Sequence, residues 1–498
     1  MSPPRAPAPS VGRRWPGWVW ACKPVNPDTP QRGARETERP PSNPRRGPSR
    51  ASPTPNPTEG QKMDTTDQST RRERWAWYLY DFGNSAYAAV VLLTVYSAYF
   101  KEVVVGGAEG SRLWGIAVGI AMLVVAVTSP VLGAIADFSA AKKRFLLFYT
   151  VLACLFTGLL FFARAGTILI GMLFFILAEI GYRSAQVFYN GLLPEIAGPE
   201  EVGTISGIGW AVGSVGGIVC LLLILPPIVL VGSDLVTRLS LVVAAVFYAL
   251  FALPALIWIR EQARSHPLPE GETYLTVGFK RLWRTFKTAR RFREFVKFVV
   301  AFLIYNDGVI MALDFAAIIG TVLFGMDQEQ LILFIILVHV TSIAGAYGLG
   351  LLADRIGCKR TLILSNLMMI GLVLWLFFGR SSLEFWIIGA LAGIAMTGLQ
   401  SVSRTMVSVL SPPGQSAEFY GFFAVAGRTS SFIGPTVYGW VAAEGALWYR
   451  AQGLATRAAE QAGQRLAILS IAAFLVVGLL ILLTVSETKG RAAARAET

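Results

Sequence analysis

Polar and charged residues interrupt apolar stretches that are each long enough to cross a bilayer. In the first stretch, residues 77 to 100, Tyr80, Asp81 and Asn84 stand among apolar neighbours. A charged side chain inside a membrane span is costly, so it usually faces a protein interior or a water-filled cavity. Asp81 is therefore a candidate for substrate binding or proton coupling. The alternative is that the span begins later and that Asp81 caps the helix at the membrane surface.

The seventh apolar stretch, residues 295 to 324, carries Tyr305, Asn306, Asp307 and Asp314. Asp307 and Asp314 are seven residues apart, which is about two helical turns, so both are expected to face one cavity. A carboxyl group that binds and releases a proton inside a span is what a proton-coupled carrier needs. The candidates for proton coupling are Asp81, Asp307 and Asp314.

Two arginines lie inside apolar stretches. Arg183 follows Glu179 by four residues, so the two share a helix face and neutralise each other, either as a structural pair or as part of a coupling or binding site. Arg404 has no acidic residue four positions away, so in a buried position it requires a partner from another helix or an anionic ligand. Arg404 is the favoured substrate contact, with a structural pair as the alternative. The candidates for the substrate cavity are Tyr80, Asp81, Asn84, Arg183, Gln186, Asn190, Tyr305, Asn306, Asp307, Gln400 and Arg404.

Two similar loops follow the second and eighth stretches, GAIADFSAAKKR from Gly133 and GLLADRIGCKR from Gly350. Each places a glycine and an aspartate at the end of one helix and a basic cluster at the start of the next. The glycine permits close helix approach, and the carboxylate can pair with a nearby base or face a helix N-terminus. Ordinary basic loops explain the Lys and Arg residues but not the repeated Gly and Asp. The candidates for gating are Gly133, Asp137, Lys143, Arg144, Gly350, Asp354, Gly357, Lys359 and Arg360.

Composition requires a membrane protein built from helices. Of the 498 residues, 54% are hydrophobic and 15% are charged, and the mean hydropathy is +0.54, which lies outside the balance of soluble domains. Successive apolar runs of about 20 residues suit α-helical spans, since each helix satisfies its own backbone in lipid. The two histidines, His266 and His339, are far apart, so we expect no metal or other cofactor. No set of nucleophile, base and orienting residue can be assembled from the sequence, so an enzyme is the least favoured class.

Twelve apolar runs set the expected organisation. They lie at about 77 to 100, 113 to 136, 145 to 163, 168 to 191, 203 to 225, 239 to 259, 295 to 324, 331 to 353, 361 to 379, 384 to 410, 418 to 441 and 466 to 485. Residues 1 to 70 hold fifteen of the 26 prolines and are predicted to be disordered. Met63 is a plausible start, so residues 1 to 62 are expected to be dispensable. The expected units are a bundle at 75 to 260, a basic linker at 261 to 294, a bundle at 295 to 488 and a tail at 489 to 498.

The basic residues indicate topology rather than a polyanionic partner. The formal charge is +13, and residues 1 to 62 contribute eleven Lys/Arg against four Asp/Glu. Most of the remaining excess lies in even-numbered connections, which places both termini in the cytoplasm by the positive-inside rule. The linker interleaves basic and aromatic residues and is expected to form an interfacial amphipathic helix. No nucleic-acid partner is expected.

The chain repeats itself with a nearly constant offset. Tyr80-Asp81-Phe82-Gly83 corresponds to Tyr305-Asn306-Asp307-Gly308, and the Gly133 loop corresponds to the Gly350 loop. Similar segments in the same order indicate two homologous six-helix halves. The predicted fold class is all-α and polytopic, with twelve transmembrane helices in two pseudo-symmetric six-helix bundles.

The two loops resemble the signature loop of the major facilitator superfamily, in which these residues gate conformational change. YDFGNSAY from Tyr80, FYNGLLPEIA from Phe188 and AEFYGFFAVAGRTSSFIGP from Ala417 resemble its vacuole-effluxer-like branch. This resemblance covers about residues 75 to 488. It implies secondary transport of a small polar metabolite, with amino-acid efflux favoured, by a monomer in a bacterial plasma membrane. A passive facilitator and a drug or sugar exporter are the alternatives.

Overall fold

The computed structural model describes residues 57–138, 141–196, 202–261, 271–289, 291–411, 419, 422–423, 427 and 431–495. All the helices and strands assigned within these ranges are helices, which agrees with the predicted fold class. Residues 1 to 56 of the predicted tail lie outside the described ranges. The prediction of disorder is wrong for residues 57 to 70, because the first helix begins at Pro57. Extending a helix from a stable span costs little, and proline is tolerated in its first turn.

The first half contains six spans. The first span is interrupted and consists of α1 (Pro57–Tyr87), η1 (Ala88–Leu92), α2 (Val95–Tyr99) and η2 (Phe100–Val105). The other five are formed by α3 (Gly107–Phe138), α4 (Lys142–Leu159) with η3 (Leu160–Phe162), α5 (Ile168–Ile196), α6 (Val202–Val231) and α7 (Asp234–Trp258).

The second half begins after α8 (Tyr274–Ala289). Its seventh span is broken into α9 (Arg293–Asp314) and α10 (Ala316–Phe324), and the chain continues through α11 (Gln328–Ile356), α12 (Cys358–Phe378), α13 (Ser382–Leu410), α15 (Ile433–Ala451), α16 (Thr456–Thr484) and α17 (Glu487–Arg495). Eleven described helical stretches are long and apolar enough to cross a membrane. The predicted run at 418 to 441 falls partly outside the described residues. Its described part belongs to α15, which ends ten residues later than predicted, at Ala451.

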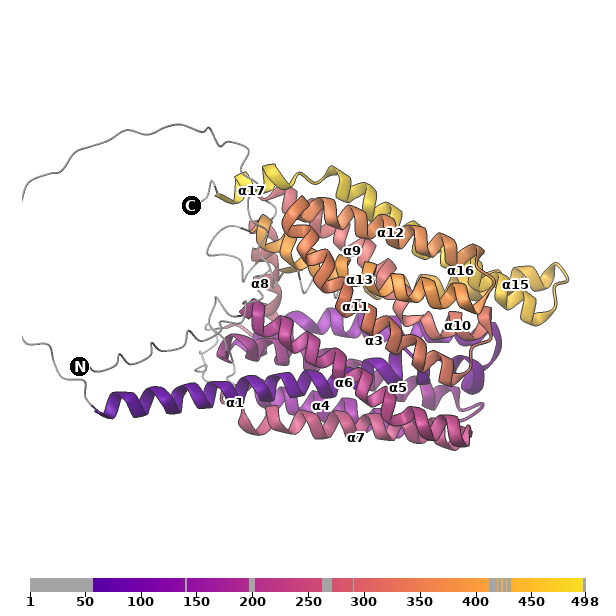
Figure 1. Cartoon of the computed structure of the whole chain (residues 1–498), viewed down its shortest axis with the longest axis horizontal. Helices are drawn as coiled ribbons and strands as arrows, with labels where there is room; N and C mark the ends of the chain where they lie inside the picture. Colours follow the sequence, from indigo (N-terminus) through magenta and orange to yellow (C-terminus); the bar gives the residue numbers. More distant parts are fainter. Residues whose placement is uncertain are drawn as a thin grey trace, which may run out of the picture.

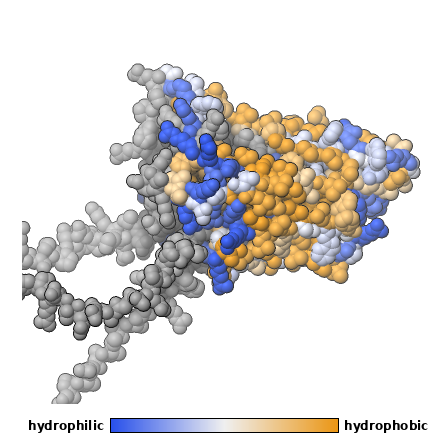
Figure 2. Space-filling view, turned by 90° about the horizontal axis from the view of Figure 1, so that it is seen from above, coloured by the Kyte–Doolittle hydropathy of each residue, from blue (hydrophilic) through white to orange (hydrophobic). Residues whose placement is uncertain are grey.

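The spans run side by side as one bundle, with the two halves in separate layers (Figure 1). We call the end that carries α8 and α17 the basic end, and the opposite end, where α15 joins α16, the far end. A broad apolar belt separates the hydrophilic ends (Figure 2). This belt has the character of a surface that contacts lipid.

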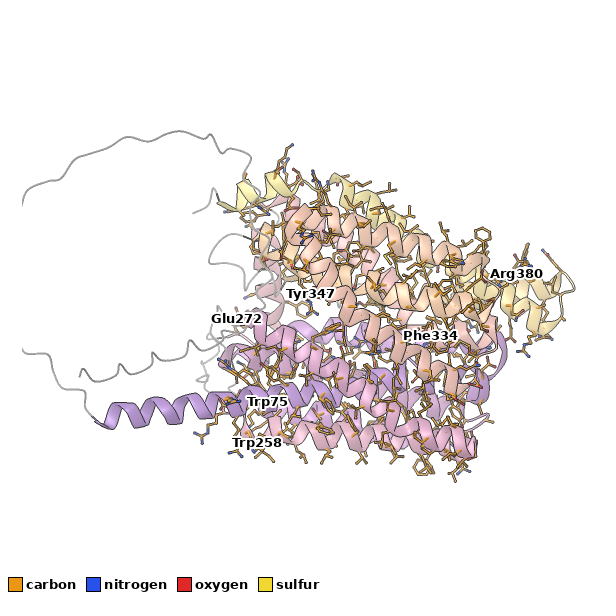
Figure 3. All side chains as sticks on the ribbon, viewed as in Figure 1. Trp75, Trp258, Glu272, Phe334, Tyr347 and Arg380 are labelled. Carbon is orange, nitrogen blue, oxygen red and sulfur yellow. The ribbon has the colours of Figure 1, made fainter. Side chains whose placement is uncertain are left out.

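Aromatic and basic side chains mark the ends of the belt. Trp75 and Trp258 lie toward the basic end, and Arg380 lies at the far end (Figure 3). The guanidinium of Arg72 stacks over the Trp258 ring, 4.4 Å from its centroid. Tryptophan and arginine at these levels are typical of residues that anchor a span at the membrane surface.

The linker helix α8 lies across the basic end (Figure 1). Its Leu275, Phe279 and Trp283 are exposed at intervals of four residues. Lys280 pairs with Glu272 and holds the pKa of that carboxyl below its usual range. An exposed apolar stripe beside basic residues is what the predicted interfacial amphipathic helix requires.

Candidate functional site

The two halves meet closely at the far end. A Cβ added to Gly115 of α3 would lie 2.4 Å from the carbonyl oxygen of Pro435 and 3.1 Å from the Cα of Gly439, both in α15. Backbones can approach this closely only where the contact residues have little or no side chain. The small residues of α3 and α15 therefore let the first half seal against the second.

Four polar contacts hold this far-end seal. Their donors and acceptors come from different halves: Trp114 Nε1 donates to the Asp314 carbonyl at 3.0 Å, Gln464 Nε2 to Ser111 Oγ at 2.6 Å, Gln328 Nε2 to the Thr94 carbonyl at 3.3 Å, and Lys101 Nζ to Glu460 Oε2 at 3.1 Å. Lys101 is 2% exposed and also contacts Glu102. A buried ammonium that loses one partner is strongly destabilised, so this ion pair favours the closed seal.

At the basic end, corresponding contacts stay within one half. In the first half, Glu73 accepts from the Arg260 amide at 3.0 Å and Glu261 from the Lys142 amide at 2.6 Å. In the second, Glu294 accepts from the Ser486 amide at 2.5 Å and Glu487 from the Lys359 amide at 3.1 Å. Carboxylates thus cap helix ends and brace each half internally. Among these polar contacts of the described residues, each half is tied to itself at the basic end and to its partner at the far end.

The two predicted gating loops differ in what the structure describes. In the second loop, Gly357 has a φ of +92°, a conformation that favours glycine. There, Lys359 Nζ donates to the Leu483 carbonyl at 2.8 Å, which ties the loop to α16. In the first loop, a Cβ added to Gly133 would meet nothing within 4 Å. The expected close approach at Gly133 is therefore absent in this state, and the Asp137 side chain lies outside the described residues.

The other gating candidates lie on helices at the basic end. Lys143 and Arg144 are in the first turn of α4, with Arg144 exposed. Gly350 and Asp354 belong to the last turns of α11, and Arg360 is exposed near the start of α12.

Asp81 lies at the contact between the halves. Its carboxylate interacts with the side chain of Asn84 on its own helix and with the charge of Arg404 from α13. Gly213 of α6 leaves room for it, because an added Cβ would lie 2.7 Å from Asp81 Oδ2. Arg404 thus has an acidic partner on another helix, as its sequence context required.

Arg404 and Asn190 occupy corresponding places in the two halves. Each lies six positions before the end of its helix, α13 and α5 respectively, and each is exposed. Gln400 and Gln186 are one turn deeper and only partly exposed; Gln186 interacts with the Tyr182 hydroxyl. These four residues bring polar groups into both helices at similar depth from the basic end.

The two predicted tyrosines lie in the cores of their own halves. Tyr80 Oη bonds Thr150 Oγ1 at 2.7 Å and Tyr248 Oη at 2.8 Å, linking α1 to α4 and α7. Tyr305 Oη bonds Ser403 Oγ at 2.5 Å, linking α9 to α13. The expectation that Tyr80 and Tyr305 line the substrate cavity is therefore wrong for this state. Buried hydroxyl groups need hydrogen-bond partners, and these two find them inside each half.

Asp307 and Asp314 face different helices, although seven residues separate them. Asp307 is buried beside α15, where a Cβ added to Gly434 would lie 3.3 Å from Asp307 Cβ, and its neighbour Asn306 is also buried. Asp314 acts electrostatically on Arg183 and Glu179 of α5. The expectation of one shared cavity for the two aspartates is therefore wrong. The cause is that α9 passes between the second half's own helices and the first half.

Glu179, Arg183 and Asp314 form what we call the charge cluster. Arg183 Nε donates to Glu179 Oε1 at 2.7 Å, and Asp314 comes from the other half. Trp114 bridges these elements, because its ring lies 4.5 Å from that of Phe175 on α5 while its indole bonds the Asp314 carbonyl. The sequence indicated the Glu179–Arg183 pair but contained no signal that Asp314 joins it.

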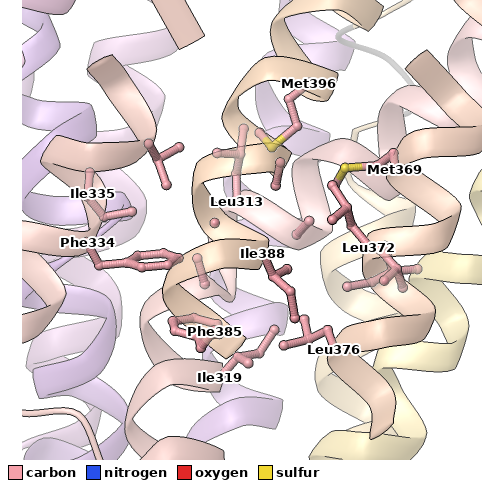
Figure 4. Close-up of a pocket in the computed structure, with 17 residues that line it drawn as sticks. Leu313, Ile319, Phe334, Ile335, Met369, Leu372, Leu376, Phe385, Ile388 and Met396 are labelled. Atoms are coloured by element: carbon pink, nitrogen blue, oxygen red, sulfur yellow. The ribbon is translucent and has the colours of Figure 1, made fainter. Parts of the chain in front are cut away.

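An apolar cavity of about 60 Å³ lies inside the second half. Phe334, Phe385, Leu372 and Met396 are among the side chains that surround it (Figure 4). A polar solute would lose its hydrogen bonds with water there without replacement, so this cavity does not suit one. Among the described residues, no group of three His, Cys, Asp or Glu side chains is placed to hold a metal ion.

Comparison with protein families gives one match that covers most of the chain. Residues 114–495 match the family described as "Vacuole effluxer Atg22 like". The chain is 26% identical over 377 residues to the uncharacterized MFS-type transporter YxiO of Bacillus subtilis, an alignment that covers 74% of this chain and 87% of the relative. It is 24% identical over 406 residues to autophagy-related protein 22 of Yarrowia lipolytica, with coverage of 64% and 68%.

Solved structures share the fold at low sequence identity. A bacterial homologue of the human lysosomal transporter Spinster, in an inward-facing and unoccupied conformation, superposes with a TM-score of 0.63 at 14% identity, covering 86% of this chain and 98% of that one. The nucleoside transporter NupG superposes with a TM-score of 0.60 at 14% identity, with coverage of 84% and 98%. At this identity the likeness shows the fold alone.

Proposed function

The chain belongs to the vacuole effluxer Atg22-like family of major facilitator transporters, and we propose that it exports a small zwitterionic solute, an amino acid first, by proton-coupled alternating access. The observation that carries this proposal is the pairing of Asp81 and Arg404 across the two halves. A pair of opposite charges offers one partner to the ammonium group of an amino acid and one to its carboxylate.

Alternating access is supported by the uneven distribution of contacts between the halves. The described far-end contacts join the halves, while the basic-end contacts that we describe stay within each half. Rocking about a central site would break the first set and leave the second intact. With the basic end in the cytoplasm, as the positive-inside rule predicts, this state is inward-facing.

The polar groups at the depth of Arg404 support recognition of a small solute. Gln186 and Gln400 offer amide donors and acceptors, and Asn84 contacts Asp81. We assign Asp81 to the solute's ammonium group, Arg404 to its carboxylate, and Gln186, Asn190 and Gln400 to the rim of the site. Arg183 and Asp314 are assigned to coupling, and Asp307 is a second coupling candidate.

The cellular setting is part of the proposal. A bacterial plasma membrane, cytoplasmic termini and a functional monomer fit the basic end and a bundle in which each half is complete. The solute and protons are the proposed partners, and the lipid bilayer is the medium.

Uptake into proteoliposomes tests the function. The purified protein is reconstituted, a panel of radiolabelled amino acids is supplied outside, and a pH difference of either sign is imposed. We expect one or more amino acids to accumulate against their gradient under one sign only. Arg404→Gln is expected to lower the initial rate at least tenfold, because the carboxylate loses a charged partner.

The matched control for Arg404→Gln is Arg380→Gln at the far end, which is expected to keep the wild-type rate within twofold. Equilibration of the solute without accumulation would indicate a passive facilitator, and the coupling proposal would then be abandoned. Equal rates for the two arginine variants would remove Arg404 from the binding site.

A further inference from the structure

The charge cluster is buried between the halves and carries an odd number of charged groups. Glu179 is 0% exposed and Asp314 is 3% exposed. Two carboxylates face one guanidinium, so the ionised cluster has a net charge of −1. Burying an uncompensated charge costs several kcal/mol, and one bound proton removes that charge.

One oxygen of each carboxylate is left over after the ion pair is made. Glu179 Oε2 and Asp314 Oδ2 are buried and accept no hydrogen bond from any residue that the structure describes. A buried carboxylate oxygen without a donor is strongly unfavourable. Protonation turns one of these oxygens into a donor and satisfies it.

The cluster is joined directly to the far-end seal. Asp314 is the last residue of α9, and its carbonyl receives the Trp114 indole from the first half. The next residue, Phe315, lies at the break before α10 and packs its ring 4.1 Å from that of Tyr438. Tyr438 Oη donates to Gln464 Oε1 at 2.8 Å, and Gln464 bonds Ser111 across the halves. Movement of Asp314 is thereby transmitted to the seal.

Other titratable groups around the cluster are neutral tyrosines or lie beyond it. Tyr87 of α1 faces Glu179, and its ring stacks on that of Tyr182 at 4.6 Å. Asp81 acts on Tyr182 on the side away from Asp314 in sequence. Arg183 is the cation that acts on both Glu179 and Asp314 among the described residues.

We propose that Glu179 and Asp314 share a single proton beside Arg183, and that this proton stabilises the closed far end. The inference rests on the proposed function only in taking the halves to alternate. When the far end opens, water reaches the cluster and the net charge becomes tolerable, so the proton leaves to solvent. The closed far end is therefore favoured at low pH and loses population as pH rises.

Distance measurements by pulsed electron paramagnetic resonance test the proposal without any solute. Spin labels replace Leu235, at the far end of the first half, and Phe378, at the far end of the second, in a background whose four cysteines are changed to serine. Both positions are exposed. We expect one short distance at pH 5.5 and a longer population at pH 8.5, with the ratio of long to short rising at least about tenfold, as linkage to one proton allows.

The isosteric variants Asp314→Asn and Glu179→Gln remove the excess charge permanently. Each is expected to keep the short distance at both pH values and to lose at least 90% of the wild-type change. Glu329→Gln, in the first turn of α11 and away from the cluster, is the matched control and should retain the full change. Size-exclusion profiles confirm that each variant is folded.

A wild-type distance that ignores pH would overturn the proposal, as would variants that respond like the wild type. Failure of amino-acid transport together with an intact pH response would instead remove the proposed solute and leave the proton site standing.

Discussion

At the scale of single residues, the useful distinction is between polar groups that face across the halves and polar groups that brace one half. Asp81 and Asp314 meet charges from the other half, whereas Tyr80 and Tyr305 are satisfied within their own. Because only the first kind changes partners when the halves move, substitutions of Asp81 and of Tyr80 are expected to have different consequences.

Asp81→Asn is expected to lower the affinity for an amino acid by at least about tenfold, because the ammonium group loses a charged partner. The protein is expected to remain folded, since the amide keeps the shape of the carboxylate. Solute-induced thermal shift in detergent measures the affinity. An unchanged shift would show that Asp81 does not contact the solute.

Gly213→Ala offers a complementary test of the room around Asp81. The added Cβ would lie 2.7 Å from Asp81 Oδ2 and 2.9 Å from Ser85 Oγ, so the carboxylate must move. We expect the transport rate to fall severalfold. Gly217→Ala on the same helix, whose nearest neighbour would be 3.4 Å away, is the control and should stay within twofold of the wild type.

At the scale of elements, the second gating loop depends on a single backbone conformation. Gly357 joins α11 to α12 with φ +92° and ψ 155°, which a residue with a Cβ adopts only under strain. Ser, Ala or any other L-residue there must distort the turn that positions Lys359 against α16 and α17. The short connection thus transmits movement of α11 to the end of α16.

Gly357→Ala is expected to destabilise the protein by about 1 to 3 kcal/mol, the usual cost of such a conformation. Thermal unfolding in detergent measures the change. Gly371→Ala within α12 is the control, because an added Cβ meets nothing within 4 Å and alanine favours a helix. If both variants melt at the same temperature, the strain argument fails.

At the scale of the whole molecule, the structure is one state of a two-state device. Close backbone contact between α3 and α15 and the buried Lys101–Glu460 pair hold the far end shut. The matching state requires these contacts to separate, while the contacts of Glu73, Glu261, Glu294 and Glu487 inside each half persist. The far-end seal is therefore the part of the molecule that must be reversible.

Cross-linking the seal is expected to stop transport. Ser111→Cys and Gln464→Cys replace a pair whose side chains bond at 2.6 Å, and a short bifunctional thiol reagent joins them. Transport is expected to fall at least tenfold and to recover after reduction. Either single cysteine treated alike is the control, and continued transport by the cross-linked protein would contradict the need for opening.

The sequence by itself determined the membrane-spanning helices, the two-half repeat and most of the charged residues that matter. Apolar length and period depend on local chemistry, so they can be read along the chain. The expected orientation of Arg404 toward another helix also followed from its neighbours.

Only the tertiary structure decided which helix each polar group meets. Helical period assigns a residue to a face but does not say which neighbour covers that face, so Tyr80 and Tyr305 were misplaced and Asp307 and Asp314 were wrongly joined. Asp314 reaches Arg183 through contact between halves that lie more than a hundred residues apart. The closed far end, too, is a property of that packing, because one sequence must be compatible with both states.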